Sequence, residues 1–481
     1  MLANDGIALA VTNKYGQGLG RSQKTNFAPR LGVAYQVSPK LVARAGFGLF
    51  YNGFENRGFS PNLGENYPFQ FNFQFQPADP GHAITYSTCG PGGTPVTATL
   101  ETGFSCTPLD PLLVNASGLA LRGIQFNYVT PYAMSGNLTL QYQLTSSMSV
   151  QAGYVTSLAR HLEVFPGANN VTGILPTTAD PTKIPVSQGG VPFPDFGQGS
   201  SFATTNGNSN YHGLQTKVEK QFAGGLNFLA TYTWSKVLSD AHDLLNGGSL
   251  AGYRAPDVPG FGIRGDYGLA AFDIRNVFHF SGGYELPFGK GKRFFSDASG
   301  LTNKLVGGWS TIWTATLQGG QPITLNCPSG TAKGVGCYDL KVQGQSPKLG
   351  LHTDANGKLS WFGNPAAFAQ PGPCTAAGGA ACTLAALGGG PTQVVGPGFH
   401  RLDFSLFKEI PLSERFRLQF RTEIFNIFNH PNFNAPGFGG NGVVAISGST
   451  DFTNNHFGEI GSTRDAPYDP RQIQFALKLY Y

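Results

Sequence analysis

The sequence predicts an all-β protein, an antiparallel sheet of about 11 strands that crosses a membrane as part of a β-barrel. Three observations lead to this prediction. Charged residues make up only 12% of the 481 residues, about half the usual share, whereas Gly reaches 67 and Phe 38. Segments of about 10–12 residues alternate between polar and apolar positions, which is the period of a β-strand. The connections between them are alternately short and long, as in outer-membrane barrels with short periplasmic turns and long extracellular loops.

The segments that fit the strand pattern form hairpins in chain order and leave one final strand. The hairpins pair 26–37 with 40–51, 134–144 with 148–158, 211–222 with 226–236, 272–286 with 305–317, and 400–410 with 416–428, and the final strand is 471–481. The long connections between hairpins are 52–133, 159–210, 237–271, 318–399 and 429–470. Strands of this length suit a membrane barrel, because about 9–11 tilted residues cross a bilayer.

Alternation is clearest in the residues 416–424. Phe416, Leu418, Phe420, Thr422 and Ile424 alternate there with Arg417, Gln419, Arg421 and Glu423. In a barrel the first set faces lipid, and the polar set faces the lumen, where it lines a channel or contacts a plug. In a soluble sheet the polar set forms a solvated face instead, and alternation alone does not separate the two. Aromatic residues near strand ends fit the interfacial girdles of a barrel: Phe50, Tyr51, Tyr232, Trp234, Trp309, Trp313, Phe428, Tyr480 and Tyr481.

The final strand ends on an aromatic residue. Ile473, Phe475, Leu477, Leu479 and Tyr481 share one face, opposite Gln472, Gln474, Lys478 and Tyr480. Because every backbone group must be paired in lipid, we expect this strand to close the seam of a barrel. The pattern resembles the C-terminal signal that the outer-membrane insertion machinery reads. The alternative is an ordinary C-terminal edge strand.

The six cysteines all fall in the long connections, in stretches rich in Gly, Pro and Thr. They form three pairs that are close in sequence: Cys89 with Cys106, Cys327 with Cys337, and Cys374 with Cys382. None has the C-x-x-C spacing of a zinc site. The sequence therefore predicts loop disulfides made in an oxidising compartment, with six free thiols as the alternative. The connectivity stays open, because six cysteines allow 15 pairings.

Several other classes are excluded. No apolar run approaches the ~18–20 residues of a spanning helix. The first residues lack the basic region of a secretory signal. The net charge of +5 is scattered along the chain, so nucleic acid is not an expected partner. The catalytic and nucleotide-binding motifs are missing, so we expect neither enzyme activity nor a cofactor.

Three smaller features are candidates for a role. His279, His400 and His430 are scattered, and no metal site is predicted from them. Asp266, Asp273 and Arg275 form a charge cluster near a strand start, for which polar pairing is favoured over catalysis. The segment 54–76 alternates aromatic and amide residues, which suits either contact with a ligand or packing on neighbouring loops.

Five phrases resemble TonB-dependent receptors, most closely the Oar-like branch, whose members carry a carboxypeptidase-regulatory-like domain ahead of the plug. They are TNFAPRLGVAYQV (25–37), FDIRNVFHFSGGYELPFGKGKRF (272–294), GGWSTIWTATLQGGQPITL (307–325), HRLDFSLFKEIPLSERFRLQFRTEIFNIFNHPNF (400–433) and GEIGSTRDAPYDPRQIQFALKLYY (458–481). The resemblance covers most of the chain from about residue 25 onward. It implies a 22-stranded barrel filled by an N-terminal plug, with a periplasmic TonB box that couples the plug to inner-membrane energy.

The chain departs from that plan. Residues 1–25 are expected to belong to an extracellular loop and 26–481 to form the C-terminal half of the barrel, while the plug, the TonB box and the regulatory domain are not found. The implied function is uptake of a large or scarce solute across the Gram-negative outer membrane. The implied partners are outer-membrane lipid, the insertion machinery, the TonB system through the absent plug, and an unidentified solute. The alternatives are a passive porin-like channel, a secreted β-sandwich adhesin or binding protein, and a non-functional remnant.

Overall fold

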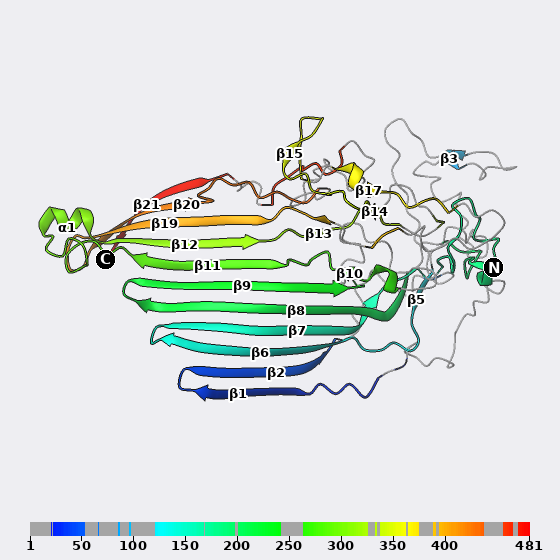
Figure 1. Ribbon diagram of the computed structural model, residues 1–481, viewed down its shortest axis with the longest axis horizontal. Coiled ribbons are helices and arrows are strands. Elements are labelled where there is room, and N and C mark those ends of the chain that lie inside the picture. The colour runs from blue at the N-terminus through cyan, green and yellow to red at the C-terminus, as the bar shows by residue number, and fades with distance from the viewer. Residues whose placement is uncertain are drawn as a thin grey trace.

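The structure, a computed structural model, is dominated by one large antiparallel sheet (Figure 1). It describes residues 21, 23–52, 66, 85–86, 96–97, 121–167, 169–197, 201–241, 263–325, 332–333, 337–361, 364–374, 388–390, 394–436, 456–464 and 470–481. The strands follow one another across the sheet in the order β1-β2-β6-β7-β8-β9-β11-β12-β19-β20-β21. Each strand therefore pairs with its neighbours in the chain, as a meander of hairpins requires.

The predicted strands are all present, with small shifts at their ends. They are β1 (Arg30–Ser38), β2 (Leu41–Tyr51), β6 (Tyr132–Thr145), β7 (Met148–Val164), β8 (Ser201–Ala223), β9 (Leu226–Ser239), β11 (Asn276–Glu285), β12 (Trp309–Gln318), β19 (Phe399–Pro411), β20 (Arg417–Phe425) and β21 (Gln472–Tyr480). Short β5 (Arg122–Ile124) pairs with β8 in parallel, and β10 (Gly268–Leu269) pairs with β9. The all-β, antiparallel prediction is confirmed.

The main differences in length are in β7 and β8, which reach 17 and 23 residues. The sequence predicted 148–158 and 211–222, because the alternation fades beyond these segments. The extra length continues the ladder toward the long connections through two register shifts, where His161 adopts a positive φ of 57°. Bulges of this kind increase the local twist, so the strands extend past the regular part of the sheet.

The short turns and the long connections lie at opposite ends of the sheet (Figure 1). The β8–β9 turn contains Gly224 and Gly225, both with positive φ, at 63° and 81°. Two consecutive positive φ values define the hairpin turn whose twist matches that of antiparallel strands, and glycine adopts them at no steric cost. In the described parts of the long connections the strands are short, and besides β5 and β10 they are β3 (Thr85–Tyr86), β4 (Val96–Thr97), β13 (Pro322–Ile323), β14 (Leu340–Lys341), β15 (His352–Thr353), β16 (Leu359–Ser360), β17 (Phe368–Ala369) and β18 (Val394–Val395).

The link between β11 and β12 contains a helix that the sequence did not predict, α1 (Gly300–Val306). Its last carbonyls are satisfied from outside the helix. Lys408 donates to the carbonyl oxygens of Leu305 and Gly307, and its ammonium lies 5.2 Å from the centre of the Trp309 ring. Among the residues that the structure describes, the other helical segments are the 3-10 turns η5 (Val186–Gln188), η6 (Ile263–Asp266) and η7 (Pro365–Ala367). Within the described ranges, no helix has the length and hydrophobicity to cross a membrane.

The register sorts the side chains of the sheet onto two faces. Ile473 lies opposite Ile424, and Leu477 lies opposite Phe420, so apolar residues of successive strands adjoin. We call this side the apolar face. Its exposed members include Leu31, Val33, Tyr35, Phe47, Leu138, Leu140, Tyr142, Tyr154, Leu214, Tyr232, Trp234, Leu317, Ile473, Phe475, Leu477 and Leu479. The opposite side, which carries Arg44, Gln141, Lys217, Glu409, Gln419 and Arg421, is the polar face.

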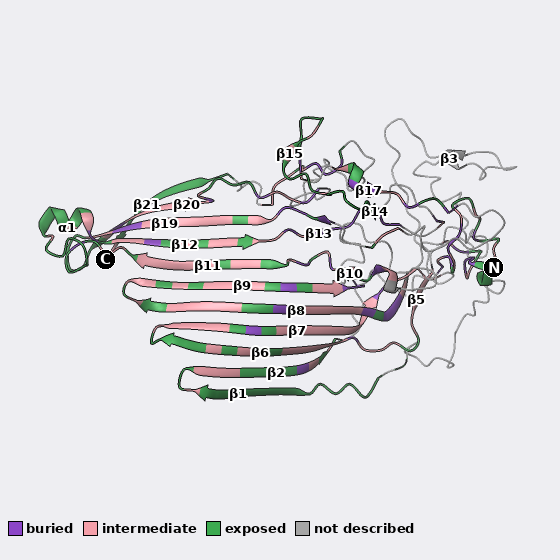
Figure 2. Ribbon diagram, in the orientation of Figure 1, coloured by how far each residue is buried: buried purple, intermediate pink, exposed green. Residues whose placement is uncertain are grey.

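The hydrophobic core lies mainly in the long connections, whereas the strands of the sheet are mainly intermediate or exposed (Figure 2). One cluster joins Val171, Ile174, Leu175 and Val191, between β7 and β8, to Ala332 and Cys374, between β12 and β19. A second cluster joins the β12–β19 connection to the β20–β21 connection and consists of Ile323, Leu325, Ala367, Phe368, Val394, Ala435 and Phe457, with Trp361 against it. The long connections thus pack on one another.

Candidate functional site: the polar face of the last three strands

The polar face carries a hydrogen-bonded network where β19, β20 and β21 meet. Gln419 is its centre, and its side chain is 8% exposed. Its amide nitrogen donates to Oε1 of Glu409 at 3.0 Å, and its amide oxygen accepts from the Tyr480 hydroxyl at 3.2 Å and from Nε of Arg421. The three strands bring these groups together because β20 pairs with β19 on one side and with β21 on the other.

Two arginines add positive charge to the network. Arg417 lies 3.5 Å from a carboxylate oxygen of Glu409, and its guanidinium lies 4.8 Å from the centre of the Tyr480 ring. Arg421 lies 5.1 Å from the centre of the Phe407 ring, and it reaches the Tyr480 hydroxyl at 3.4 Å. Guanidinium groups stack on aromatic rings in this way while they keep their donors free for anions or amides.

The predicted polar set Arg417, Gln419, Arg421 and Glu423 therefore shares one face, and the structure brings the first three together. Glu423 lies further along β20, opposite Ser405 and Gln474. Sequence reasoning missed Glu409 and Tyr480 as partners, because only the strand register shows that they adjoin Gln419. The register of β19 and β20 could in principle be inferred from the sequence, because the short turn PLSER fixes how the two strands of this hairpin pair.

Polar pairs continue across the rest of the polar face. Arg401 donates to Asp403 at 2.9 Å, and Asp403 also accepts the backbone N–H of Asn426 at 2.8 Å. Lys217 lies 2.9 Å from Glu219 on β8. On the first strands, Arg44 donates to Gln141 at 2.6 Å. One side of the sheet is thus lined with hydrogen-bonding groups over its whole width.

The residues of the last strand lie as the alternation predicts. Ile473, Phe475, Leu477 and Leu479 lie on the apolar face with exposed side chains, and Phe475 stacks on Phe420 with ring centres 6.2 Å apart. Tyr481 follows the end of β21 and is exposed. Two of the expected girdle aromatics are on the other side. Tyr480 joins the Gln419 network, and Phe50 lies under the guanidinium of Arg30 at 4.8 Å. Successive residues of a strand point to opposite faces of the sheet, so two adjacent aromatic residues such as Tyr480 and Tyr481 cannot both lie on the lipid-facing side.

Two of the cysteines lie in the described ranges. Cys337 and Cys374 are both disulfide-bonded and buried. Cys89, Cys106, Cys327 and Cys382 lie outside the described residues, so the three sequence-local pairs stay a prediction. The segment 54–76 also lies outside, except for Asn66, which exchanges two hydrogen bonds of 2.7 Å with the backbone of Arg122.

The residues of the predicted charge cluster have different hydrogen-bond partners. Asp266 accepts a hydrogen bond of 2.8 Å from the Tyr338 hydroxyl. Asp273 accepts the backbone N–H of Val237 at 2.8 Å, and burial raises the pKa of its carboxyl despite the positive charges of Arg275 and Lys236. His279 bonds Thr316, whereas the rings of His400 and His430 lie 5.6 Å apart. Within the described part of the chain, no three His, Cys, Asp or Glu residues are placed to hold a metal ion.

A model of the outer membrane beta barrel domain matches residues 2–474. The chain belongs to this family. Its apolar face is therefore the lipid-facing side of an outer-membrane β-barrel, and its polar face is the side that faces away from lipid. The localisation in the outer membrane and the β-barrel class predicted from the sequence are confirmed.

Solved outer-membrane proteins share low similarity with this outer-membrane barrel chain. The outer membrane transporter YddB from Escherichia coli is 8% identical, with a TM-score of 0.41, over 95% of this chain and 40% of that one. The FrpB iron transporter from Neisseria meningitidis is 12% identical, with a TM-score of 0.36, over 95% and 39%. The chain thus spans about 40% of the length of these structures. No curated protein matches the sequence.

The barrel sheet is open in this structure. β1 and β21 are the two ends of the path, and among the described residues each pairs with one neighbour. The other described sheets have only two strands each, so the described residues include no second large sheet of the kind that forms a β-sandwich. An apolar surrounding stabilises each large exposed side chain, such as Phe475 or Leu477, by roughly 1.5–3 kcal/mol relative to water. Contact with lipid therefore stabilises the apolar face.

Proposed function

We propose that this outer-membrane barrel chain belongs to a TonB-dependent receptor of the Oar-like branch and serves the uptake of a large or scarce hydrophilic solute. The observation that carries the proposal is the Gln419 network. It places charged and amide groups on the side of the sheet opposite the lipid, where they offer hydrogen bonds to a solute or to a plug. In this proposal residues 26–481 supply the C-terminal half of a 22-stranded barrel, and a plug with its TonB box completes the transporter.

The long connections favour a receptor over a passive pore. Two apolar clusters fix them to one another, and buried Asn169 binds the segment 193–197 through hydrogen bonds to the carbonyl oxygens of Phe193 and Phe196. Packed loops over the extracellular end suit the recognition of a solute, whereas a general pore needs an unobstructed mouth. The proposal involves no enzyme chemistry.

The test is energy-dependent uptake by the full-length protein. Cells with and without the gene are grown on a panel of sole carbon, nitrogen and iron sources, and the responsive solute is then supplied in labelled form. We expect uptake that a protonophore abolishes. Steady large conductance in planar bilayers, with uptake insensitive to the protonophore, would establish the porin alternative.

A matched pair of variants links the test to the network. Arg421→Gln removes a charge from the polar face, whereas Arg415→Gln removes one from the exposed β19–β20 turn. We expect Arg421→Gln alone to lower uptake at equal protein levels in the outer membrane. Equal uptake by both variants would show that the Gln419 network does not serve the solute path.

A further inference from the structure

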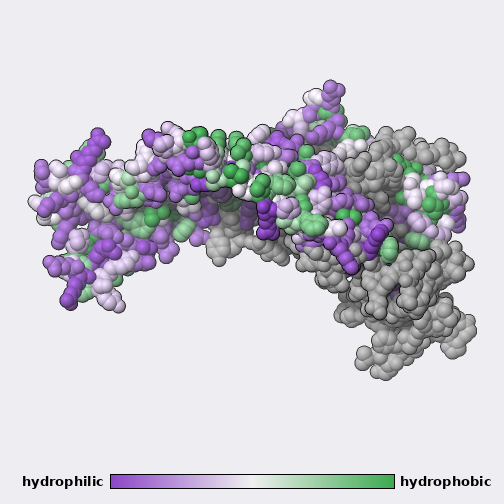
Figure 3. All heavy atoms as spheres, turned by 90° about the horizontal axis from the view of Figure 1, so that it is seen from below, coloured by the Kyte–Doolittle hydropathy of each residue, from purple (hydrophilic) through white to green (hydrophobic). Residues whose placement is uncertain are grey.

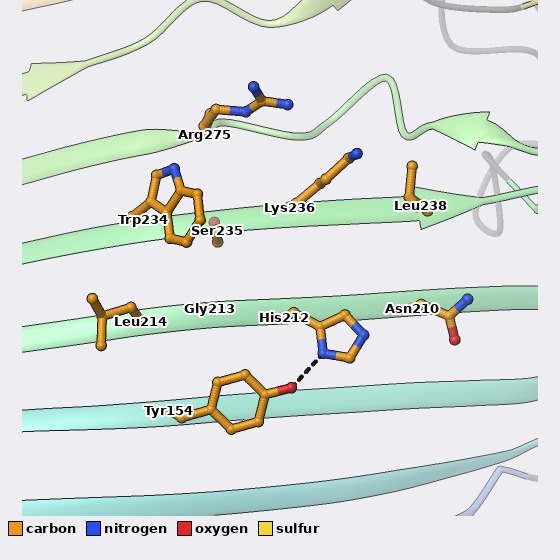
Figure 4. Close-up of a pocket in the computed structure, with 10 residues that line it drawn as sticks. All are labelled: Tyr154, Asn210, His212, Gly213, Leu214, Trp234, Ser235, Lys236, Leu238 and Arg275. Atoms are coloured by element: carbon orange, nitrogen blue, oxygen red, sulfur yellow. Dashed lines mark hydrogen bonds between the residues drawn. The ribbon is translucent and has the colours of Figure 1, made fainter.

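A cavity of about 420 Å³ opens on the lipid-facing side of the sheet, across β7, β8, β9 and the start of β11 (Figure 4). The strand register arranges its side chains in rows. Tyr154, Leu214 and Trp234 form an apolar row, and the next row contains His212 and Lys236. Asn210 and Leu238 follow beyond these, and Arg275 lies beside the two β9 side chains Trp234 and Lys236.

The cavity lies at the level of the outer leaflet. Lys236 is close to the end of β9 at Ser239, from which the chain enters a long connection. The long connections are extracellular in this family of barrels. The order from the middle of the sheet outward is apolar, then aromatic and cationic, which is the order of a bilayer interface. In Figure 3, hydrophobic residues gather along the middle of the molecule, and hydrophilic ones dominate the end with the short turns.

The positive charges of the cavity are not neutralised by ion pairs. Within the described part of the chain, neither Lys236 nor Arg275 has an ion pair or a side-chain hydrogen bond, and both side chains are exposed. Asp273 is the carboxylate that interacts electrostatically with both cations, but it is 2% exposed, accepts the backbone N–H of Val237 and is not one of the residues that line the cavity. The His212 ring is held by the Tyr154 hydroxyl, 2.6 Å from Nδ1.

A second cavity of about 390 Å³ continues the first toward the loops. It is lined by Arg160, Asn208, Asn210, Asp240 and Tyr267, and Asn210 belongs to both cavities. The Asn210 amide donates to the Tyr267 hydroxyl at 2.6 Å. This polar extension of the groove carries amide and hydroxyl groups and one pair of opposite charges, since Asp240 interacts electrostatically with Arg160. The cations that stay without such a partner are therefore those of the first cavity.

We infer that this groove binds a lipid of the outer leaflet whose headgroup carries phosphate. The phosphate contacts Lys236 and Arg275, and the acyl chains lie along Tyr154, Leu214 and Trp234. Free cations beside apolar side chains match such an amphiphile, because Arg and Lys bind phosphate oxygens and the apolar row provides a surface for acyl chains. The inference rests on the membrane placement of the apolar face and is independent of the proposed uptake.

The test measures lipid binding by native mass spectrometry of the full-length protein, purified in a neutral detergent. The probes are lipid A, a phosphorylated glycolipid of the outer leaflet, and the same lipid with its phosphates removed. We expect the double variant K236Q/R275Q to bind lipid A about 25-fold more weakly, since each of the two cations near a phosphate surface contributes about fivefold. The charge-conserving variant K236R/R275K should bind as the wild type does.

The matched control is K220Q/R293Q, which removes one lysine and one arginine at the opposite, short-turn end of the sheet. Lys220 lies on the apolar side of β8, opposite Phe228. This variant should bind lipid A normally. Three results would each overturn the inference. K236Q/R275Q could bind lipid A as tightly as the wild type, the control could lose as much affinity as K236Q/R275Q, or the wild type could bind the dephosphorylated lipid as tightly as lipid A. Displacement of lipid A by millimolar inorganic phosphate would identify a soluble-anion site instead.

Discussion

Tyr480 on β21 donates a hydrogen bond of 3.2 Å to the side-chain oxygen of Gln419 on β20. This contact joins the last strand to the polar network of β19 and β20. We predict that Gln419→Leu lowers the free energy of unfolding by about 1–3 kcal/mol, because Glu409, Arg421 and Tyr480 lose a partner on a partly buried face. Chemical unfolding in vesicles measures the effect. Gln474→Leu, at an exposed position of the same face, is the control and should change the stability little.

The lipid-facing side of the last strand provides a second prediction. Phe475→Arg should destabilise the inserted protein by about 2–4 kcal/mol near the midplane of the bilayer, because it places a charge in hydrocarbon. The control Gln474→Arg changes the adjacent residue, which points to the polar face, and should be tolerated. Folding yield into vesicles measures both. Equal tolerance of the two arginines would contradict the assignment of the faces.

Lys408 stabilises the link that contains α1. Its ammonium binds the carbonyl oxygens of Leu305 and Gly307 at the end of the helix. We predict that Lys408→Met leaves these carbonyls without their donor and makes the segment 286–308 more sensitive to protease in inserted protein. Lys304→Met changes an exposed lysine of α1 itself and serves as the reference. If both variants are cleaved at the wild-type rate, the lysine does not hold the helix.

Burial raises the pKa of the Asp240 carboxyl, just beyond the end of β9, against the hydrogen bonds that it accepts from Asn208. A raised carboxyl pKa favours folding while the group is protonated, and this contribution is lost as pH rises through the folded pKa. We therefore expect the stability of Asp240→Asn relative to wild type to increase from pH 4 to pH 7, as denaturant titrations at each pH would show.

Asp180 supplies a control of opposite sign. Hydrogen bonds from Thr182 lower the pKa of its carboxyl, so its contribution is present at neutral pH and lost as pH falls. Because this pKa lies below the ordinary value of 3.8, Asp180→Asn should show no gain in stability relative to wild type between pH 4 and pH 7. A parallel trend in the two variants would mean that burial of Asp240 is not the cause.

The loop disulfides can be tested directly. Peptide mapping without reduction should recover Cys89–Cys106, Cys327–Cys337 and Cys374–Cys382 as linked pairs. Cys374 belongs to the cluster of Val171 and Leu175, so reduction should also expose the β7–β8 connection to protease. Any other pairing would show that spacing in sequence is a poor guide in these connections.

The strands were predictable because alternation marks them residue by residue, as in Ile473, Phe475, Leu477 and Leu479. The turns were predictable from their length and from Gly224-Gly225. The partners within the polar network were not, since the contact of Gln419 with Glu409 and Tyr480 depends on the register of two strand pairs. The extra length of β8 and the helix α1 were missed because the apolar residues in these segments do not recur at the spacing of a strand or a helix. The extension of β8 depends on pairing with β7, and α1 depends on its contact with Lys408.

The shared loop core has a consequence for engineering. Ala332 and Cys374, from one connection, complete a cluster whose other members lie between β7 and β8. Replacing either the β7–β8 or the β12–β19 connection by a foreign loop would remove apolar contacts from the connection that is kept. Chimeras that aim to transfer solute preference between homologues would therefore have to exchange these two connections as one cassette, and surface variation in one should be matched by compensating changes in the other.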